Sequence, residues 1–224
     1  MEPMGSYSAY QVAAHAPVGE RMSFLRKIYG LLTLSILIAF SSATFVLGNE
    51  AVLQFVFQTH LFFFIAEIAA IFFVFWARHK QSVGLIALFG FTGLTGVTTA
   101  PLIFAYQNVA GQAAALTLVI FVSLSLYAVF TKRDLSFLSG LLFSGLMILI
   151  FGGLLNAFFF HSSAASFMFS SFAVFLFSGF ILYDTQNILK RYPTDEYISA
   201  TLALYVDILN LFVHLLFLLG GQRD

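Results

Sequence analysis

Seven long apolar segments constrain the fold of this chain more than any other feature of its sequence. Each is close to the ~20 residues that an α-helix needs to cross the hydrocarbon of a bilayer. Lipid offers the backbone no hydrogen-bond partners, so a spanning segment of this kind has to be helical. Strands of a membrane barrel would alternate in hydropathy, whereas these segments are continuously apolar. The predicted spans are 28–48, 51–76, 83–105, 109–130, 135–160, 165–189 and 198–220.

The composition favours the same class of protein. Hydrophobic residues make up 60% of the 224 residues and charged residues only 9%, whereas soluble domains average about 25% charged residues. The chain has no cysteine, which excludes disulfides and thiolate metal sites. Its formal net charge is +0, so no nucleic-acid partner is expected. We therefore expect an all-α membrane protein whose first partner is the lipid bilayer.

The joints between the segments are short and polar, which predicts one compact domain. Consecutive helices joined in this way become antiparallel neighbours. The seventh helix is apolar around most of its circumference, so we expect it to be the buried centre of the bundle. The predicted organisation is a cytoplasmic N-terminal tail over 1–27, a seven-helix transmembrane domain over 28–220 and a short C-terminal tail over 221–224.

Lysine and arginine lie almost entirely on one side of the predicted bundle. They occur before the first span and in every second joint, and the intervening joints carry none. The positive-inside rule assigns the basic side to the cytoplasm, so the N-terminus is predicted inside and, after seven spans, the C-terminus outside. The nine residues on this side are Arg21, Arg26, Lys27, Arg78, Lys80, Lys132, Arg133, Lys190 and Arg191, and only Arg223 lies on the other.

Two aspartates lie inside segments that otherwise have the character of membrane spans. An ionised aspartate at the bilayer centre costs about 2.5–3.5 kcal/mol on insertion scales, so Asp184 and Asp207 are expected to share a polar site. With a rise of about 1.5 Å per residue, Asp184 is roughly 9 Å above Lys190 and Asp207 roughly 15 Å above Tyr197. Both then lie in the cytoplasmic half. Two close carboxylates cannot both ionise cheaply, so this pair is predicted to share a proton.

Further polar residues lie on the same helices or near them. Asp207, Asn210 and His214 follow an i, i+3, i+7 pattern and form one polar stripe on the seventh helix. Glu67 lies inside the second span, and Arg78 ends that span and can reach inward along its aliphatic stem. We predict that Arg78 is a latch on the aspartate pair and that Glu67, Asn210 and His214 line a cation path.

Simpler roles also account for several of these residues. A purely structural interhelical hydrogen bond would explain the two aspartates, and helix packing would explain Glu67 or His214. His60 is expected at the membrane interface, and Asn156 is expected to hold helices together. The glycines at 90, 93 and 96, followed by Pro101, predict close packing and a kink in the third span.

Enzyme signatures give one candidate. A carboxylate dyad activates water in intramembrane aspartyl proteases, but their second aspartate lies in G-x-G-D, and here the sequence is Leu204-Tyr205-Val206-Asp207. Their Pro-Ala-Leu element is also absent, and no Walker loop, dinucleotide fingerprint or zinc motif occurs. We therefore do not expect an enzyme, and we expect no cofactor.

Three motifs in this order resemble the transmembrane Bax inhibitor motif family, also called Bax inhibitor-like proteins. They are Lys132 to Leu138 (KRDLSFL), Leu182 to Gln186 (LYDTQ) and Leu202 to Phe212 (LALYVDILNLF). The resemblance extends from about residue 22 to the end. The short length is similar to that of a bacterial inner-membrane member.

The resemblance implies three helical hairpins around a central last helix and a pH-sensitive calcium leak. It also implies that Asp184 and Asp207 are the pH-sensing pair, that Arg78 bonds to the pair, and that Glu67 lies on the cation path. Calcium would then be the transported ion, with Asp184, Asp207 and Glu67 as candidate ligands. One bacterial branch of the family instead associates with a membrane-bound AAA+ protease and restrains it.

Three functional hypotheses follow from the sequence. The first is a pH-gated calcium leak at the aspartate pair. The second is a regulatory partner of a membrane-bound AAA+ protease or of stress machinery, acting through the tail and the lipid-facing surface. The third, an intramembrane aspartyl hydrolase, is disfavoured because the G-x-G-D element is missing.

The predicted topology is testable with a reporter protein fused after Asp224. Because nine of the ten basic residues lie on one side, the fusion should report an extracytoplasmic location. Activity of a cytoplasmic reporter at this position would contradict the arrangement of seven spans.

Overall fold

The computed structural model of the protein describes residues 12–221, and the parts of the predicted tails at 1–11 and 222–224 lie outside this range. Seven helices are long and apolar enough to cross a membrane, which confirms the predicted fold class. In chain order the elements are α1 (Val18–Leu47), α2 (Glu50–Gln58), α3 (His60–Ala77), α4 (Gln81–Ala105), α5 (Gln107–Phe130), α6 (Leu138–Leu155), the π-helical turn η1 (Asn156–Phe160), α7 (Ser163–Lys190) and α8 (Tyr197–Gly220).

The first helix extends well beyond the predicted span. It begins at Val18, directly after Pro17, so residues 18–27 of the predicted tail are helical. The predicted start of the span at residue 28 followed hydropathy alone, because the residues before it are polar. The helix continues through them because Phe24 is buried in the bundle and Ile28 is fully buried, which gives this polar stretch an apolar face to pack.

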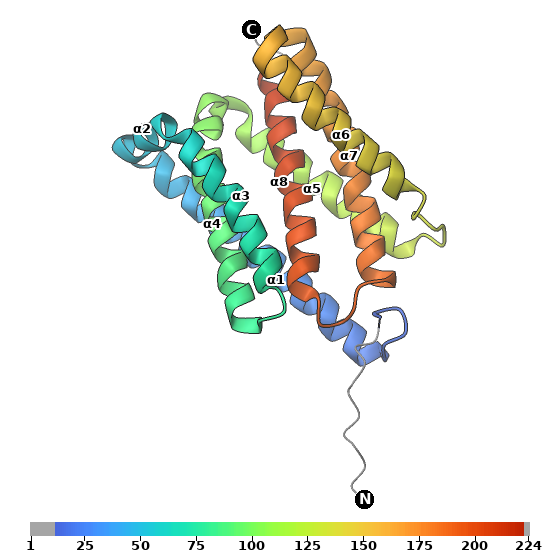
Figure 1. Ribbon diagram of the computed structural model, residues 1–224. Coiled ribbons are helices and arrows are strands. Elements are labelled where there is room, and N and C mark those ends of the chain that lie inside the picture. Colours follow the sequence, from blue (N-terminus) through green and yellow to red (C-terminus); the bar gives the residue numbers. More distant parts are fainter. Residues whose placement is uncertain (1–11, 222–224) are drawn as a thin grey trace, which may run out of the picture.

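The predicted second span, 51–76, is divided at Thr59 into a short helix and a spanning helix. The Thr59 hydroxyl donates to the backbone oxygen of Phe55 at 2.6 Å, and such local side-chain bonds compete with the helix ladder. At 1.5 Å per residue the 18 residues of α3 cover about 27 Å, close to the ~30 Å hydrocarbon core. The spanning segment is therefore α3 alone, and α2 lies at the end of the bundle away from the start of α1 (Figure 1).

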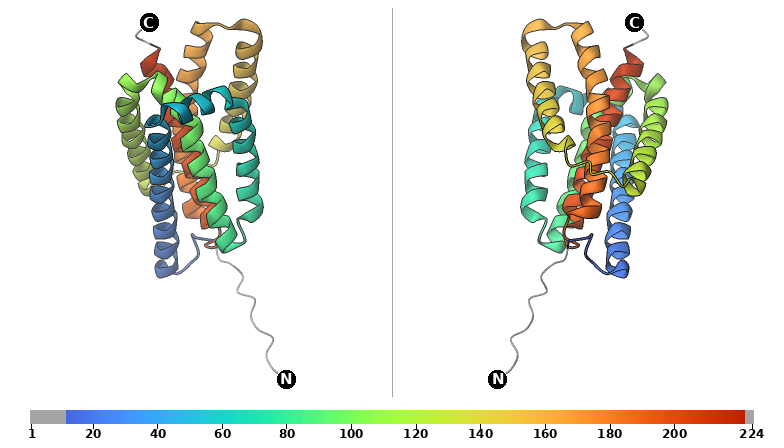
Figure 2. Two further views of the ribbon diagram at one scale, coloured as in Figure 1. Left: turned by 90° about the vertical axis from the view of Figure 1, so that its left-hand side faces the viewer. Right: turned by 90° about the vertical axis from the view of Figure 1, so that its right-hand side faces the viewer.

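The last helix is the centre of the bundle, as predicted. Helix α8 packs against α1, α4, α5 and α7, while α3 and α6 pack outside on α4 and α7. The two side views in Figure 2 show α8 running through the middle of the other helices. Packing on α8 thereby fixes the positions of α1, α4, α5 and α7.

Short joints do not make every consecutive pair of helices a packed hairpin. Helices α6 and α7 do pack along each other, but α1 packs mainly on α4, which also carries α3. Helices α4 and α5 meet near their joint at Tyr106 and share little further contact. The hairpin arrangement implied by the family resemblance therefore holds for the α6 and α7 pair, and the other helices are organised around α4 and α8.

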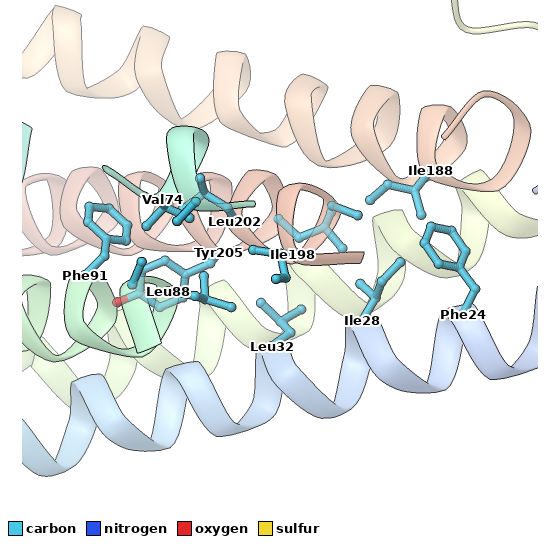
Figure 3. Close-up of a cluster of buried hydrophobic side chains, with 14 of the residues drawn as sticks. Phe24, Ile28, Leu32, Val74, Leu88, Phe91, Ile188, Ile198, Leu202 and Tyr205 are labelled. Carbon is cyan, nitrogen blue, oxygen red and sulfur yellow. The ribbon is translucent and has the colours of Figure 1, made fainter. Parts of the chain in front are cut away.

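A buried apolar cluster joins the helices at the end of the bundle where α1 begins. Figure 3 shows its side chains converging from α1, α3, α4, α7 and α8. Among its members, Ile28 and Val74 are fully buried and Ile198 is 1% exposed. The cluster fixes the end of α8 that leads to Asp207, so it positions one half of the aspartate pair.

Gly96 allows α1 and α4 to approach closely. A Cβ atom at this position would lie 2.2 Å from the backbone oxygen of Ala39, whereas a Cβ atom at Gly90 would have no neighbour within 4 Å. The predicted close packing of the third span is thus provided by Gly96 and not by Gly90. The nearest atom belongs to the backbone of α1, so it cannot move aside without shifting that helix.

Gly96→Ala should destabilise the protein by about 1–3 kcal/mol, because the added methyl group forces the two helices apart. Thermal unfolding in detergent should show a lower midpoint than for the wild type. Gly90→Ala is the matched control and should be neutral or slightly stabilising, since alanine is the better helix former. Equal midpoints for the two variants would contradict the close approach.

Candidate functional site

Asp184 and Asp207 meet between α7 and the central helix α8. Their carboxyl groups lie within hydrogen-bonding reach of each other. Asp207 is 4% exposed, and Asp184 is half-buried. The two helices pack along each other, so the pair is set by a long interface and not by a loop. The structure thus brings together the two aspartates that the sequence singled out.

Hydrogen bonding within this pair requires a proton. The Oδ2 atom of Asp207 is buried and has no donor among the described residues. Two unit charges 4 Å apart repel by on the order of 4 kcal/mol at an effective dielectric constant of about 20. A proton held between the carboxyl groups removes this repulsion and supplies the missing donor. The arrangement therefore favours one shared proton.

Arg78 does not bond to the pair, which differs from the prediction. Its Nε lies 3.8 Å from Oε1 of Glu196 and donates to Nε2 of His79 at 3.1 Å. His79 Nδ1 in turn lies 3.6 Å from the same oxygen of Glu196. Helix α3 ends just before Arg78, where the partly buried joint leading into α8 offers Glu196 as an acidic partner. The hydropathy pattern does not indicate whether Arg78 contacts Glu196 or the aspartate pair.

Tyr192 lies near both the aspartate pair and the ionic contacts of Glu196. Its ring packs against the buried apolar cluster, and its hydroxyl is within electrostatic range of Asp184, Asp207, Glu196 and Arg78. Burial, reinforced by the nearby carboxylates, raises the pKa of Tyr192 to about 12. The phenol therefore stays protonated at neutral pH.

The chain before α1 holds this loop in place. The backbone N–H of Ala13 donates to the Tyr192 oxygen at 2.9 Å, and Val12 forms an antiparallel bridge with Pro193. Ala13 is fully buried. This N-terminal strap, residues 12–16, therefore covers the loop that carries Tyr192 and Glu196. Polarity alone suggested a loose tail, since no sequence signal marks a contact with a loop 180 residues away.

The family motifs contact one another beside the pair. The Gln186 side chain donates to the Arg133 backbone oxygen at 2.9 Å and accepts from the Leu135 backbone N–H at 2.7 Å. One amide side chain thereby ties the KRDLSFL loop to α7, two residues beyond Asp184. The spacing of the motifs gave no indication of this bond.

A second polar layer connects α3, α4 and α8. The Thr98 hydroxyl donates to Glu67 Oε1 at 3.3 Å, and the Thr95 hydroxyl bonds to that of Tyr205. Glu67 is half-buried and lies within electrostatic range of Tyr205. The threonines recur on α4 at 92, 95, 98 and 99. This helical spacing was the signal that could have predicted a polar stripe on the third span.

The remaining predicted residues make no hydrogen bond to the aspartate pair among the described residues. Asn210 donates to the Val206 backbone oxygen of its own helix at 2.8 Å. His214 stacks on Phe177, with ring centroids 6.0 Å apart, and its buried Nδ1 has no hydrogen-bond partner among the described residues.

Glu67 belongs to the other polar layer, which joins α3, α4 and α8. The candidate metal set Asp184, Asp207 and Glu67 is therefore not one cluster, and residues 12–221 contain no group of three or more acidic or histidine side chains able to hold a metal.

Two further residues have structural roles. Asn156 bonds to Ser162 and donates to the Ser166 hydroxyl at 2.9 Å, so it joins η1 to α7 as predicted. His60 is exposed at the first residue of α3, and its Nδ1 lies 3.0 Å from the Phe57 backbone oxygen. Neither residue faces the aspartate pair.

Comparison with known proteins gives matches over nearly the whole chain. Residues 21–224 match the protein family described as inhibitor of apoptosis-promoting Bax1. The Golgi anti-apoptotic protein of vaccinia virus (strain Lister) is 37% identical, covering 92% of this chain and 88% of the viral protein. Protein lifeguard 4 of Mus musculus is 35% identical over 91% of this chain and 87% of its own length. An uncharacterised membrane protein of Vibrio cholerae is 37% identical over 92% of each chain.

The N-terminal strap can be tested with a charge at its buried residue. Ala13→Glu should release it from the Tyr192 loop, because burying a carboxylate without a partner is costly. Hydrogen exchange of the backbone amides of residues 12–16 should then rise at least about tenfold, since losing about 1.4 kcal/mol of protection corresponds to this factor. Ala14→Glu adds the same charge at an exposed residue and should leave the exchange rate unchanged. Equal rates in the two variants would show that the strap is not held by this contact.

Proposed function

This chain belongs to the family of inhibitors of apoptosis-promoting Bax1, and we propose that within it the chain acts as a pH-sensitive cation leak. Calcium is the proposed ion, and Asp184 and Asp207 are the proposed pH-sensing pair. We also propose a bacterial inner-membrane location with the N-terminus in the cytoplasm. The nine basic residues on one side and the similarity to a membrane protein of Vibrio cholerae support this location.

The observation that carries the proposal is the meeting of two acids at a helix interface inside the membrane. An ionisable residue at this depth usually belongs to an ion or proton pathway, because it is costly to retain for packing alone. Here the two acids come from the central helix and its neighbour α7, so their charge state acts directly on the contact between two spanning helices. A pair of this kind is suited to couple proton binding to helix movement.

Arg78 supplies the second state in this proposal. While the pair shares a proton, its net charge is low and Arg78 remains on Glu196, the contact present in the structure. When the pair loses this proton it becomes a double anion, which attracts the guanidinium group more strongly. Movement of Arg78 inward past Tyr192 would draw the end of α3 toward α7 and α8 and close the cytoplasmic mouth. Protonation therefore opens the path, and flux should rise as the pH falls.

Calcium flux into proteoliposomes tests the proposal. Wild-type flux should increase as the pH is lowered between about 8 and 6, the range in which a buried carboxylate pair can titrate. Asp184→Asn and Asp207→Asn should each flatten this dependence, because one remaining carboxyl group has no partner to share a proton with. Asp134→Asn is the matched control, since it removes an acid from an exposed loop and should keep the wild-type profile.

Two further variants separate the sensor from the path in the same assay. Glu196→Gln frees Arg78 for the pair and should shift the midpoint of flux to lower pH. Glu67→Gln should reduce flux without moving the midpoint, since Glu67 lies in the other polar layer.

Wild-type vesicles no more permeable to calcium than empty liposomes would overturn the proposal. Regulation of a membrane-bound AAA+ protease or of stress machinery would then be the leading function, and the name of the vaccinia relative, an anti-apoptotic protein, bears on the second of these.

A further inference from the structure

An apolar groove of about 430 Å³ opens on the side of the bundle between α1 and α5. Both of these helices pack on α8, which forms the groove floor with Tyr205, Ile208, Leu209 and Phe212. The groove is separate from the aspartate pair. At 3.6 residues per turn, Asp207 lies about 140–160° around α8 from Tyr205, Leu209 and Phe212 and about 100° from Ile208.

Four of the five polar side chains that line the groove have hydrogen-bond partners, and the fifth, Tyr29, lies at one end of it. The hydroxyls of Thr33, Thr99 and Thr117 each donate to a backbone carbonyl of their own helix, at 2.8, 2.7 and 2.8 Å. The Tyr205 hydroxyl bonds to Thr95. With these donors used, the groove offers little to a polar ligand or to water, because a cavity holds water only where polar partners are available.

The groove lies at the depth of the hydrocarbon and is long enough for an extended chain. Along α1 it runs from Tyr29 to Ala43, which is about 21 Å at 1.5 Å per residue. This length exceeds half of the ~30 Å hydrocarbon core. On its rim Phe40 is 67% exposed and Leu118 is 62% exposed. The groove is therefore continuous with the lipid-facing surface, so its occupant enters from the bilayer.

We propose that this groove binds one acyl chain of a membrane phospholipid. A flexible hydrocarbon chain fits a long, narrow, apolar site that opens sideways into lipid and whose threonine and Tyr205 hydroxyls are already bonded. The headgroup would lie at the cytoplasmic end, where Tyr29 is placed as an interfacial aromatic residue would be. The bound chain fills the space between α1 and α5 and supports the central helix on the side away from Asp207.

A tryptophan at the groove floor tests whether lipid enters. In a Trp76→Phe background, which removes the only native tryptophan, Phe212→Trp places the reporter on the floor. In nanodiscs of phosphatidylcholine with brominated acyl chains, its fluorescence should be quenched. Adding Ala114→Phe fills the groove and should remove most of this quenching, whereas Ala115→Phe, on the next residue of α5 and outside the groove, should not. A floor reporter that brominated chains do not quench would overturn the proposal.

Native mass spectrometry of the full chain released from phosphatidylcholine nanodiscs identifies the occupant. One phosphatidylcholine should remain bound per chain, with occupancy at least about fivefold lower in Ala114→Phe than in Ala115→Phe. Thr33→Phe, with Leu34→Phe as its control, provides a second filling variant if Ala114→Phe does not fold. Retention of a free fatty acid in place of the phospholipid, a dimer lost on filling the groove, or equal lipid retention in all variants would each overturn the proposal.

Discussion

The hydrocarbon of a bilayer offers no hydrogen bonds, and the arrangement of polar groups in this protein follows from that constraint. Many hydroxyl groups on the spanning helices donate to a carbonyl of their own helix, as Thr117 and Ser178 do. Other polar groups are paired between helices. The Tyr205 contact with Thr95 and the Thr98 contact with Glu67 are of this kind. The aspartate pair is the extreme case, because it becomes satisfied only by taking up a proton.

The central helix connects the features that have functional consequences. One side of α8 carries Asp207 against α7, and the other side forms the floor of the apolar groove. The same helix contributes Tyr205 to the polar layer with α4, and it starts directly after Glu196. A displacement of α8 would therefore alter the acid pair, the groove and the surface contacts together. This is the connection through which, in the proposed function, a change of charge at the pair would act on the whole bundle.

At the end of the bundle where α1 begins, ionic and backbone contacts replace the apolar packing of the interior. Glu196 binds both Arg78 and His79, which ties the end of α3 to the joint before α8. The bond of Ala13 to Tyr192 adds a segment that is distant in sequence. These contacts lie at or near water, so they are weaker and more readily exchanged than those in the interior. A change of partner for Arg78 would therefore cost less free energy at this end of the bundle than in its interior.

The sequence alone determined the class of the fold, the number of spanning helices, the central position of the last helix and the pairing of Asp184 with Asp207. These follow from segment length and from the cost of placing acids in lipid, both of which are local properties of the chain. Only the tertiary structure decided that Arg78 binds Glu196, that residues 12–16 cover the Tyr192 loop, that the second span is divided at Thr59, and that α1 packs on α4. Each of these is a choice among partners of similar chemistry. Such a choice depends on which groups the fold brings within a few ångströms, and neither hydropathy nor spacing contains that information.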